Sequence, residues 1–119
     1  MKEYKDDLAT IYIDVDDTIT PDMGNSFFPK SIESIIKLSK KANIIIWSKG
    51  GLNYTKEIIN KANLVDYIAF CMPKPDLIID DLSFSDFSYS KIIKEGIWNL
   101  DMDKLEGNWV NDRINVKEI

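Results

Sequence analysis

Residues 8–18 read LATIYIDVDDT, and this stretch decides the fold. Residues 8–15 are apolar at nearly every position and rich in Ile and Tyr, a composition typical of a strand covered on both faces. Acidic residues gather at the end of this segment, at Asp14, Asp16 and Asp17, and Thr18 follows them. The sequence therefore predicts a buried first strand whose carboxyl end carries several carboxylates.

Helical and strand patterns alternate after this segment. Ile and Leu at helical spacing predict a helix over 31–41, which Asn43 separates from a short apolar strand over 44–47. An amphipathic pattern predicts a second helix over 53–62, and a third strand is expected over 67–71. This alternation predicts the α/β class, as a three-layer Rossmann-like sandwich with a mainly parallel central sheet.

The last part of the pattern is a fourth strand. Prolines at positions 73 and 75 predict a turn, because neither has an N–H group to donate to a central ladder. The apolar residues 77–79 then predict a strand that ends at Asp80 and Asp81. Weaker patterns suggest a helix over 89–95 and a strand from 96. We expect residues 1–119 to form a single domain.

Composition excludes several kinds of chemistry. The chain has 119 residues and no histidine, which rules out a Ser-His-Asp triad and a histidine-based zinc site. Its one cysteine, Cys71, can form neither an internal disulfide nor a thiolate zinc cluster. Proton transfer therefore falls mainly to the carboxylates.

Charge and hydropathy limit the kinds of partner that we expect for this protein. The formal net charge is -5 and the lysines are scattered, which argues against generic nucleic-acid binding. The first seven residues are polar rather than signal-like, and the densest apolar run, 44–47, is far too short to span a membrane. We expect a cytoplasmic protein without a membrane partner.

Polar residues at the ends of the predicted strands form a candidate site, because ligands of parallel sheets bind at the carboxyl ends of strands. Side chains alternate along a strand, so Asp14 and Asp16 should point to the same side. Together with Asp80 and Asp81 they would form an anionic cluster that requires a cation. Oxygen ligands without His or Cys favour magnesium, which also binds substrate phosphate oxygens.

The sequence DVDDT after the apolar IYI resembles the DxDxT signature of the haloacid dehalogenase (HAD) superfamily. A strand-terminal serine, a lysine and an acidic pair follow in the family's order, so the resemblance covers roughly residues 8–86. It implies that Asp14 is the nucleophile, that Asp16 is the acid/base, and that Thr18 holds the first loop. It further implies that Ser48 hydrogen-bonds the transferring phosphoryl group and that Lys74 offsets the charge there.

The resemblance also implies a magnesium site made by Asp14 and Asp16 with Asp81, while Asp80 is an alternative or additional ligand. Two other assignments stay open, because Lys49 is a rival for the role of Lys74, and Ser48 could simply cap the following helix. Asp17 stands where many relatives have glycine. No segment is long enough for a separate cap domain, and only residues 19–30 could form a small flap.

The expected function is that of a magnesium-dependent phosphatase, which hydrolyses a phosphate monoester through an aspartyl-phosphate intermediate. An uncapped site is open, which points weakly to a macromolecular phosphorylated substrate, and the sequence leaves oligomerisation open. The alternatives are a nucleic-acid end phosphatase, a phosphotransferase, and a catalytically silent phosphate-binding or scaffold protein of the same fold.

Overall fold

A computed structural model of the chain describes residues 1–81. The patterns noted at 89–95 and from 96 lie outside these residues. In chain order, the described elements are β1 (Ala9–Asp14), α1 (Pro29–Leu38), β2 (Ala42–Ser48), α2 (Leu52–Lys61), the short 3-10 helix η1 (Val65–Tyr67) and β3 (Phe70–Pro73).

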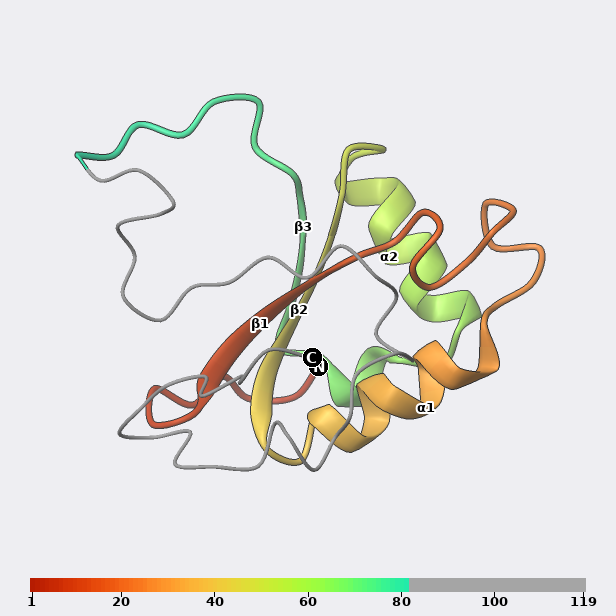
Figure 1. The fold of residues 1–119 in the computed structure, drawn as a ribbon, viewed down its shortest axis with the longest axis horizontal. Coiled ribbons are helices and arrows are strands. Elements are labelled where there is room, and N and C mark those ends of the chain that lie inside the picture. Colours follow the sequence, from red (N-terminus) through yellow and green to blue (C-terminus); the bar gives the residue numbers. More distant parts are fainter. Residues whose placement is uncertain (82–119) are drawn as a thin grey trace, which may run out of the picture.

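The strands form one parallel sheet in the order β1-β2-β3 (Figure 1). Asp14 pairs in register with Trp47, and Ser48 with Pro73, so the carboxyl ends of the strands lie at one edge. Both connections step in the same direction across the sheet, and right-handed crossovers then place α1 and α2 on the same face. The α/β class and the parallel sheet are confirmed for residues 1–81, and this arrangement is compatible with a Rossmann-like fold.

The core lies between the sheet and these two helices. Ile13 of β1 and Ile46 of β2 belong to the same buried cluster as Ile35 of α1 and Ile58 of α2, and each is at most 3% exposed. Burying an isoleucine side chain contributes about 1.5–3 kcal/mol. Because alternate residues of each strand face the helices, this cluster also fixes which side chains point to the opposite face.

The second strand begins earlier than the sequence pattern predicts, because Asn43 lies within it. Asn43 is 3% exposed, yet its side chain is fully engaged with the N-terminal segment. Its Oδ1 accepts a hydrogen bond from the Lys5 N–H at 2.8 Å, and its Nδ2 donates to the Lys5 carbonyl at 2.7 Å and the Leu8 carbonyl at 3.2 Å. A polar side chain satisfied in this way can occupy a buried strand.

Other boundaries shift for local reasons. Helix α1 begins at Pro29, because a proline at the first helical position loses no hydrogen bond, and it ends at Leu38 rather than at 41. Residues 65–67 form η1, so the third strand begins at Phe70 instead of 67. Pro73 is the last residue of β3, which is an edge strand of the described sheet.

The predicted fourth strand over 77–79 is wrong for the described structure. Residues 74–81 leave β3 as an extended loop that makes no strand (Figure 1). The side chains of Leu77, Ile78 and Ile79 are 76%, 59% and 90% exposed. A run of three apolar residues carries the local signature of a buried strand, but pairing requires a neighbour that this segment does not reach here.

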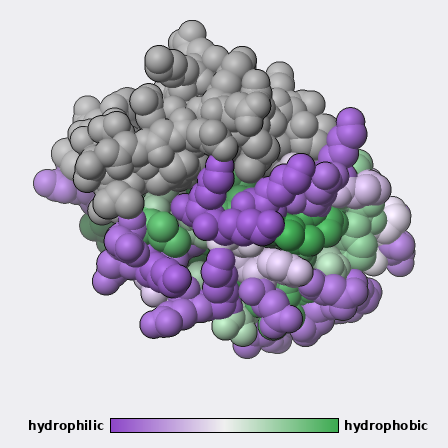
Figure 2. All heavy atoms as spheres, turned by 90° about the horizontal axis from the view of Figure 1, so that it is seen from below, coloured by the Kyte–Doolittle hydropathy of each residue, from purple (hydrophilic) through white to green (hydrophobic). Residues whose placement is uncertain are grey.

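The described surface is mainly polar. Charged and polar side chains dominate the view in Figure 2, with smaller apolar patches between them. Exposed ion pairs join Glu33 to Lys37 on α1 and Glu57 to Lys61 on α2, each at 3.2 Å. Among residues 1–81, no helix has the length and apolar character needed to cross a membrane.

Two isoleucines test this description. Ile46→Ala should lower the free energy of unfolding by about 2–5 kcal/mol, because it removes a buried side chain from the core. Ile79→Ala should change it by less than about 0.5 kcal/mol, because Ile79 is exposed. Urea unfolding of both variants measures this difference, and a loss at Ile79 as large as that at Ile46 would show that residues 77–79 are packed as a buried strand.

Candidate functional site

Asp14 is the last residue of β1, and its carboxylate forms an ion pair with Lys74. Lys74 Nζ lies 3.1 Å from Asp14 Oδ1 and 5.8 Å from the centre of the Trp47 ring. The main chain of Lys74 is fixed as well, because its N–H donates to the Ser48 carbonyl at 2.9 Å. The structure therefore places Lys74, rather than the alternative Lys49, beside Asp14.

Ser48 ends β2 at the same edge of the sheet and is fully buried. Its Oγ accepts a hydrogen bond from the Gly50 N–H at 3.0 Å, and its carbonyl also accepts one from the Gly51 N–H at 3.3 Å. Ser48 thus holds the start of the β2–α2 loop, but it does not cap α2, because the N-cap residue of that helix is Gly51 and no side chain makes a capping hydrogen bond there. A hydroxyl that accepts one hydrogen bond still has a proton to donate, so this contact leaves the role implied by the resemblance open.

Asp16 lies two residues beyond β1, in a tight turn. Asp17 has a φ of 61°, the left-handed conformation that glycine adopts without cost and that Asp adopts more readily than most residues. The Asp17 N–H donates to the Thr20 carbonyl at 2.8 Å, and Asp16 forms an isolated bridge with Thr20. An aspartate at position 17 is therefore compatible with this turn.

Thr18 joins this turn to α1 through its main chain. Its N–H donates to the Val15 carbonyl at 3.2 Å, and its own carbonyl accepts a hydrogen bond from Ser31 Oγ at 2.6 Å. Ser31 is buried in α1. Thr18 is thus part of the loop's attachment to the helix.

Tyr54 is a member of the site that the sequence pattern did not reveal. Its hydroxyl donates a hydrogen bond to Asp16 Oδ1 at 2.6 Å, across 38 positions of the chain. Partial burial, and then the hydrogen bond to Asp16 and the nearby acidic groups, raise the pKa of Tyr54 to about 12, so its hydroxyl keeps its proton at neutral pH. The sequence did contain one signal for this contact, because Tyr54 lies in the first turn of a helix that follows a strand-terminal serine. The helical periodicity of residues 53–62, however, assigned Tyr54 to the apolar face of that helix.

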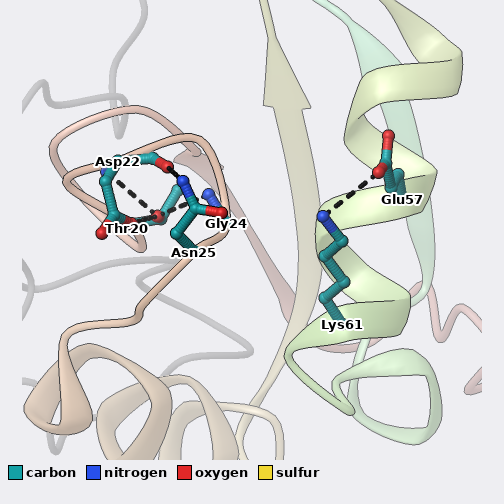
Figure 3. A network of polar contacts seen from close by, with 6 residues as sticks. All are labelled: Thr20, Asp22, Gly24, Asn25, Glu57 and Lys61. Atoms are coloured by element: carbon teal, nitrogen blue, oxygen red, sulfur yellow. Dashed lines mark hydrogen bonds and ion pairs between the residues drawn. The ribbon is translucent and has the colours of Figure 1, made fainter.

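The possible flap at residues 19–30 contains a compact loop organised by Thr20 (Figure 3). Thr20 is 1% exposed, its Oγ1 donates to the Ser26 carbonyl at 2.6 Å, and the Gly24 N–H donates to the same Oγ1 at 2.9 Å. Asp22 accepts hydrogen bonds from the Ser26 N–H and from Ser26 Oγ, both at 2.7 Å. These contacts give the loop a defined internal structure.

Gly24 brings this loop against α2. It has a φ of 89°, and a Cβ atom at this position would lie 2.6 Å from Ile58 Cδ1 and 3.5 Å from Lys61 Cδ. Any larger residue would therefore combine a strained backbone with a steric clash. The loop is packed on the helix that carries Tyr54.

The structure does not bring Asp80 and Asp81 to this site. Both lie on the exposed segment after β3, which runs toward the side of Figure 1 opposite the β1–α1 loop. Within residues 1–81, no group of three or more acidic or cysteine side chains is arranged to hold a metal ion. Asp14 and Asp16 remain, and magnesium in proteins is often bound by one or two carboxylates together with water and substrate phosphate.

A polar hollow of about 340 Å³ lies beside the ion pair. Its described lining consists of Lys49, Lys74, Pro75 and Asp76, so residues after β2 and after β3 both contribute. Two lysines and one carboxylate make this lining positive overall. The hollow can therefore receive a small anionic group next to Lys74.

Comparisons of the chain with protein-family models, with curated proteins and with solved structures give no match. The likeness to the HAD superfamily thus rests on the motif residues of this sequence alone.

The hydrogen bonds to Asp22 predict a pH-dependent stability. Those from Ser26, first its hydroxyl and then its N–H, are the main causes that lower the pKa of Asp22 from its ordinary value of 3.8. A lowered folded-state pKa contributes stability that is complete above the unfolded value and is lost as the pH falls through the folded value. The melting temperature of wild type should therefore exceed that of Asp22→Asn at pH 7, and the difference should shrink below about pH 4. A difference that grows on acidification would contradict this assignment.

Proposed function

We propose that this protein is a magnesium-dependent phosphatase that hydrolyses a phosphate monoester through an aspartyl-phosphate on Asp14. The observation that carries the proposal is the ion pair of Asp14 with Lys74 at the carboxyl edge of a parallel sheet, with Asp16 two residues away. A carboxylate nucleophile needs a nearby cation to accept a phosphate dianion, and this arrangement supplies one.

The first step transfers the phosphoryl group to the protein. A carboxylate oxygen of Asp14 attacks phosphorus, and the bond between phosphorus and the ester oxygen breaks with both electrons going to that oxygen. Asp16 gives its proton to the departing oxygen, so the alcohol leaves neutral. Lys74 reduces the repulsion between the Asp14 carboxylate and the incoming phosphate.

The second step restores the protein. A water molecule attacks phosphorus, Asp16 takes a proton from that water, and the bond between phosphorus and Asp14 breaks to release inorganic phosphate. Splitting the reaction in this way replaces one difficult displacement with two easier ones. Ser48 would donate a hydrogen bond from its hydroxyl to a phosphoryl oxygen in both steps.

The residues present fit a magnesium ion held by two of them. Asp14 would contribute a carboxylate oxygen, and Asp16 would contribute its main-chain carbonyl oxygen, which would leave the Asp16 carboxyl group for proton transfer. The ion supplies charge stabilisation for the phosphoryl group. Asp80 or Asp81 would join these ligands only if the segment after β3 turned toward β1.

The finer features of the fold belong to the same proposal. A three-layer Rossmann-like sandwich requires helices on the second face of the sheet, and these would have to come from outside residues 1–81. No separate cap domain is proposed, and the packed loop at residues 19–28 is the part of the described chain that flanks the site. A site without a cap suits a phosphorylated substrate large enough to exclude water itself.

Asp14→Asn tests the nucleophile. It should lower phosphate release from p-nitrophenyl phosphate by at least about 10³-fold, because the neutral amide does not form the acyl phosphate. Asp17→Asn is the matched control, since Asn tolerates the left-handed conformation of Asp17, and it should keep most of the activity. Phosphate release in Asp14→Asn that equals wild type would remove this assignment.

Magnesium binding predicts a rise in melting temperature. A ligand at ten times its dissociation constant stabilises the folded state by about 1.4 kcal/mol, and this gain should disappear in Asp14→Asn. Calorimetric melting with and without millimolar magnesium measures the effect, and identical curves for wild type would contradict the metal site.

Asp81→Asn, melted in the same way, distinguishes two forms of this site. A retained magnesium shift agrees with the exposed placement of Asp81. A lost shift would instead support the ligand set implied by the family resemblance.

A further inference from the structure

We infer that Tyr54 is a positioning residue for Asp16, whose carboxyl group it holds in place so that, in its protonated form, it can protonate the leaving group. This inference rests on the proposed function, because it gives Asp16 the role of acid. It adds a residue from α2 to a site otherwise built from the ends of the strands. The contact that defines it is the 2.6 Å hydrogen bond from the Tyr54 hydroxyl to Asp16 Oδ1.

The position of the Tyr54 ring is fixed by its surroundings. A Cβ atom on Gly50 would lie 2.5 Å from Tyr54 Cδ2 and 3.1 Å from Cε2, so the ring packs directly over the Gly50 backbone. Tyr54 also packs against the hydrophobic core. Thr55 fixes the start of α2, because its Oγ1 donates to the Gly51 carbonyl at 2.7 Å.

Asp16 needs such support because it is exposed. The bridge to Thr20 fixes its main chain, but an exposed carboxylate can still rotate about its side-chain bonds. A rigid tyrosine that holds one oxygen restricts this rotation and leaves the second oxygen to meet the substrate. Correct placement of a proton donor is worth a large part of the roughly 10²–10⁴-fold that general acid–base catalysis contributes.

The same contact connects the two loops of the site. Gly50 belongs to the β2–α2 loop, which begins at Ser48, whereas Asp16 belongs to the β1–α1 loop. Tyr54 contacts both, so its side chain links the position of the Asp16 carboxyl group to that of the loop after Ser48. Tyr54 would therefore hold Asp16 and the β2–α2 loop in fixed positions relative to each other, and the substrate phosphate and its leaving oxygen would lie between them.

Tyr54→Phe tests the inference, because it removes the hydroxyl and keeps the ring. The experiment compares kcat/KM for phenyl phosphate and p-nitrophenyl phosphate, two esters of similar shape. Phenolate is a poor leaving group that needs the proton, whereas p-nitrophenolate leaves without it. Tyr54→Phe should therefore lower kcat/KM for phenyl phosphate by about 10–100-fold, and that for p-nitrophenyl phosphate by less than about 3-fold.

Tyr4→Phe is the matched control, because the Tyr4 hydroxyl also makes a hydrogen bond, to Thr10 Oγ1 at 2.8 Å, but outside the site. It should change kcat/KM for the two esters equally or not at all. An equal loss on both esters in Tyr54→Phe, or no loss, would overturn the role of Tyr54 while leaving the phosphatase intact. If wild type releases phosphate from neither ester, the proposed function is overturned, and the role of Tyr54 with it.

Discussion

The parallel pairing of β1 with β2, and of β2 with β3, is the constraint on which the rest of the structure depends. It brings the ends of three strands to one edge, where Asp14, Ser48 and Lys74 meet although they are far apart in the sequence. The buried isoleucines keep this register, because a slip of β2 by one residue would turn Ile44 and Ile46 away from the helices. The same slip would exchange the faces of Trp47 and Ser48. The alternation of side chains along β2 therefore specifies both the packing of the core and the geometry of the site.

Much of this arrangement could be predicted from the sequence, because it follows from local patterns. Alternating strand and helix signals give the parallel sheet, and polar residues at the strand ends indicate the edge where Asp14 and Lys74 meet. The boundaries were harder to predict when they depended on tertiary contacts. Asn43 reads as a break in the chain, yet it lies inside β2 because Lys5 and Leu8 satisfy its amide. The role of Tyr54 was also missed because it depends on a tertiary contact. Helical periodicity predicts that its ring packs against the core, but it does not predict which residue its hydroxyl contacts.

The segment after β3 shows where a local pattern is insufficient. Residues 70–73 and residues 77–79 are both short and largely apolar, yet only the first forms a strand, through pairing with β2. The difference lies in long-range hydrogen bonding, which a run of three or four residues cannot specify alone. Asp80 and Asp81 are part of this segment, so their position relative to Asp14 depends on whether the segment pairs with the sheet. Whether Asp80 or Asp81 could share a metal ion with Asp14 would thus depend on strand pairing, and not only on the presence of acidic residues.

Electrostatics explains why a phosphate site here would need more than one cation. Asp14 and Asp16 are two residues apart at the end of β1, Lys74 is the ion-pair partner of Asp14, and a phosphate dianion would add further negative charge. Each like-charged pair about 4 Å apart repels by roughly 4 kcal/mol at an effective dielectric of 20, and solvent reduces this at the exposed Asp16. Lys49 and Lys74 line the adjacent hollow, but Asp76 offsets part of their charge. A divalent cation would therefore lower the repulsion between the phosphate and the carboxylates, and a bound phosphate would in turn attract the cation, so that the binding of each would favour the binding of the other.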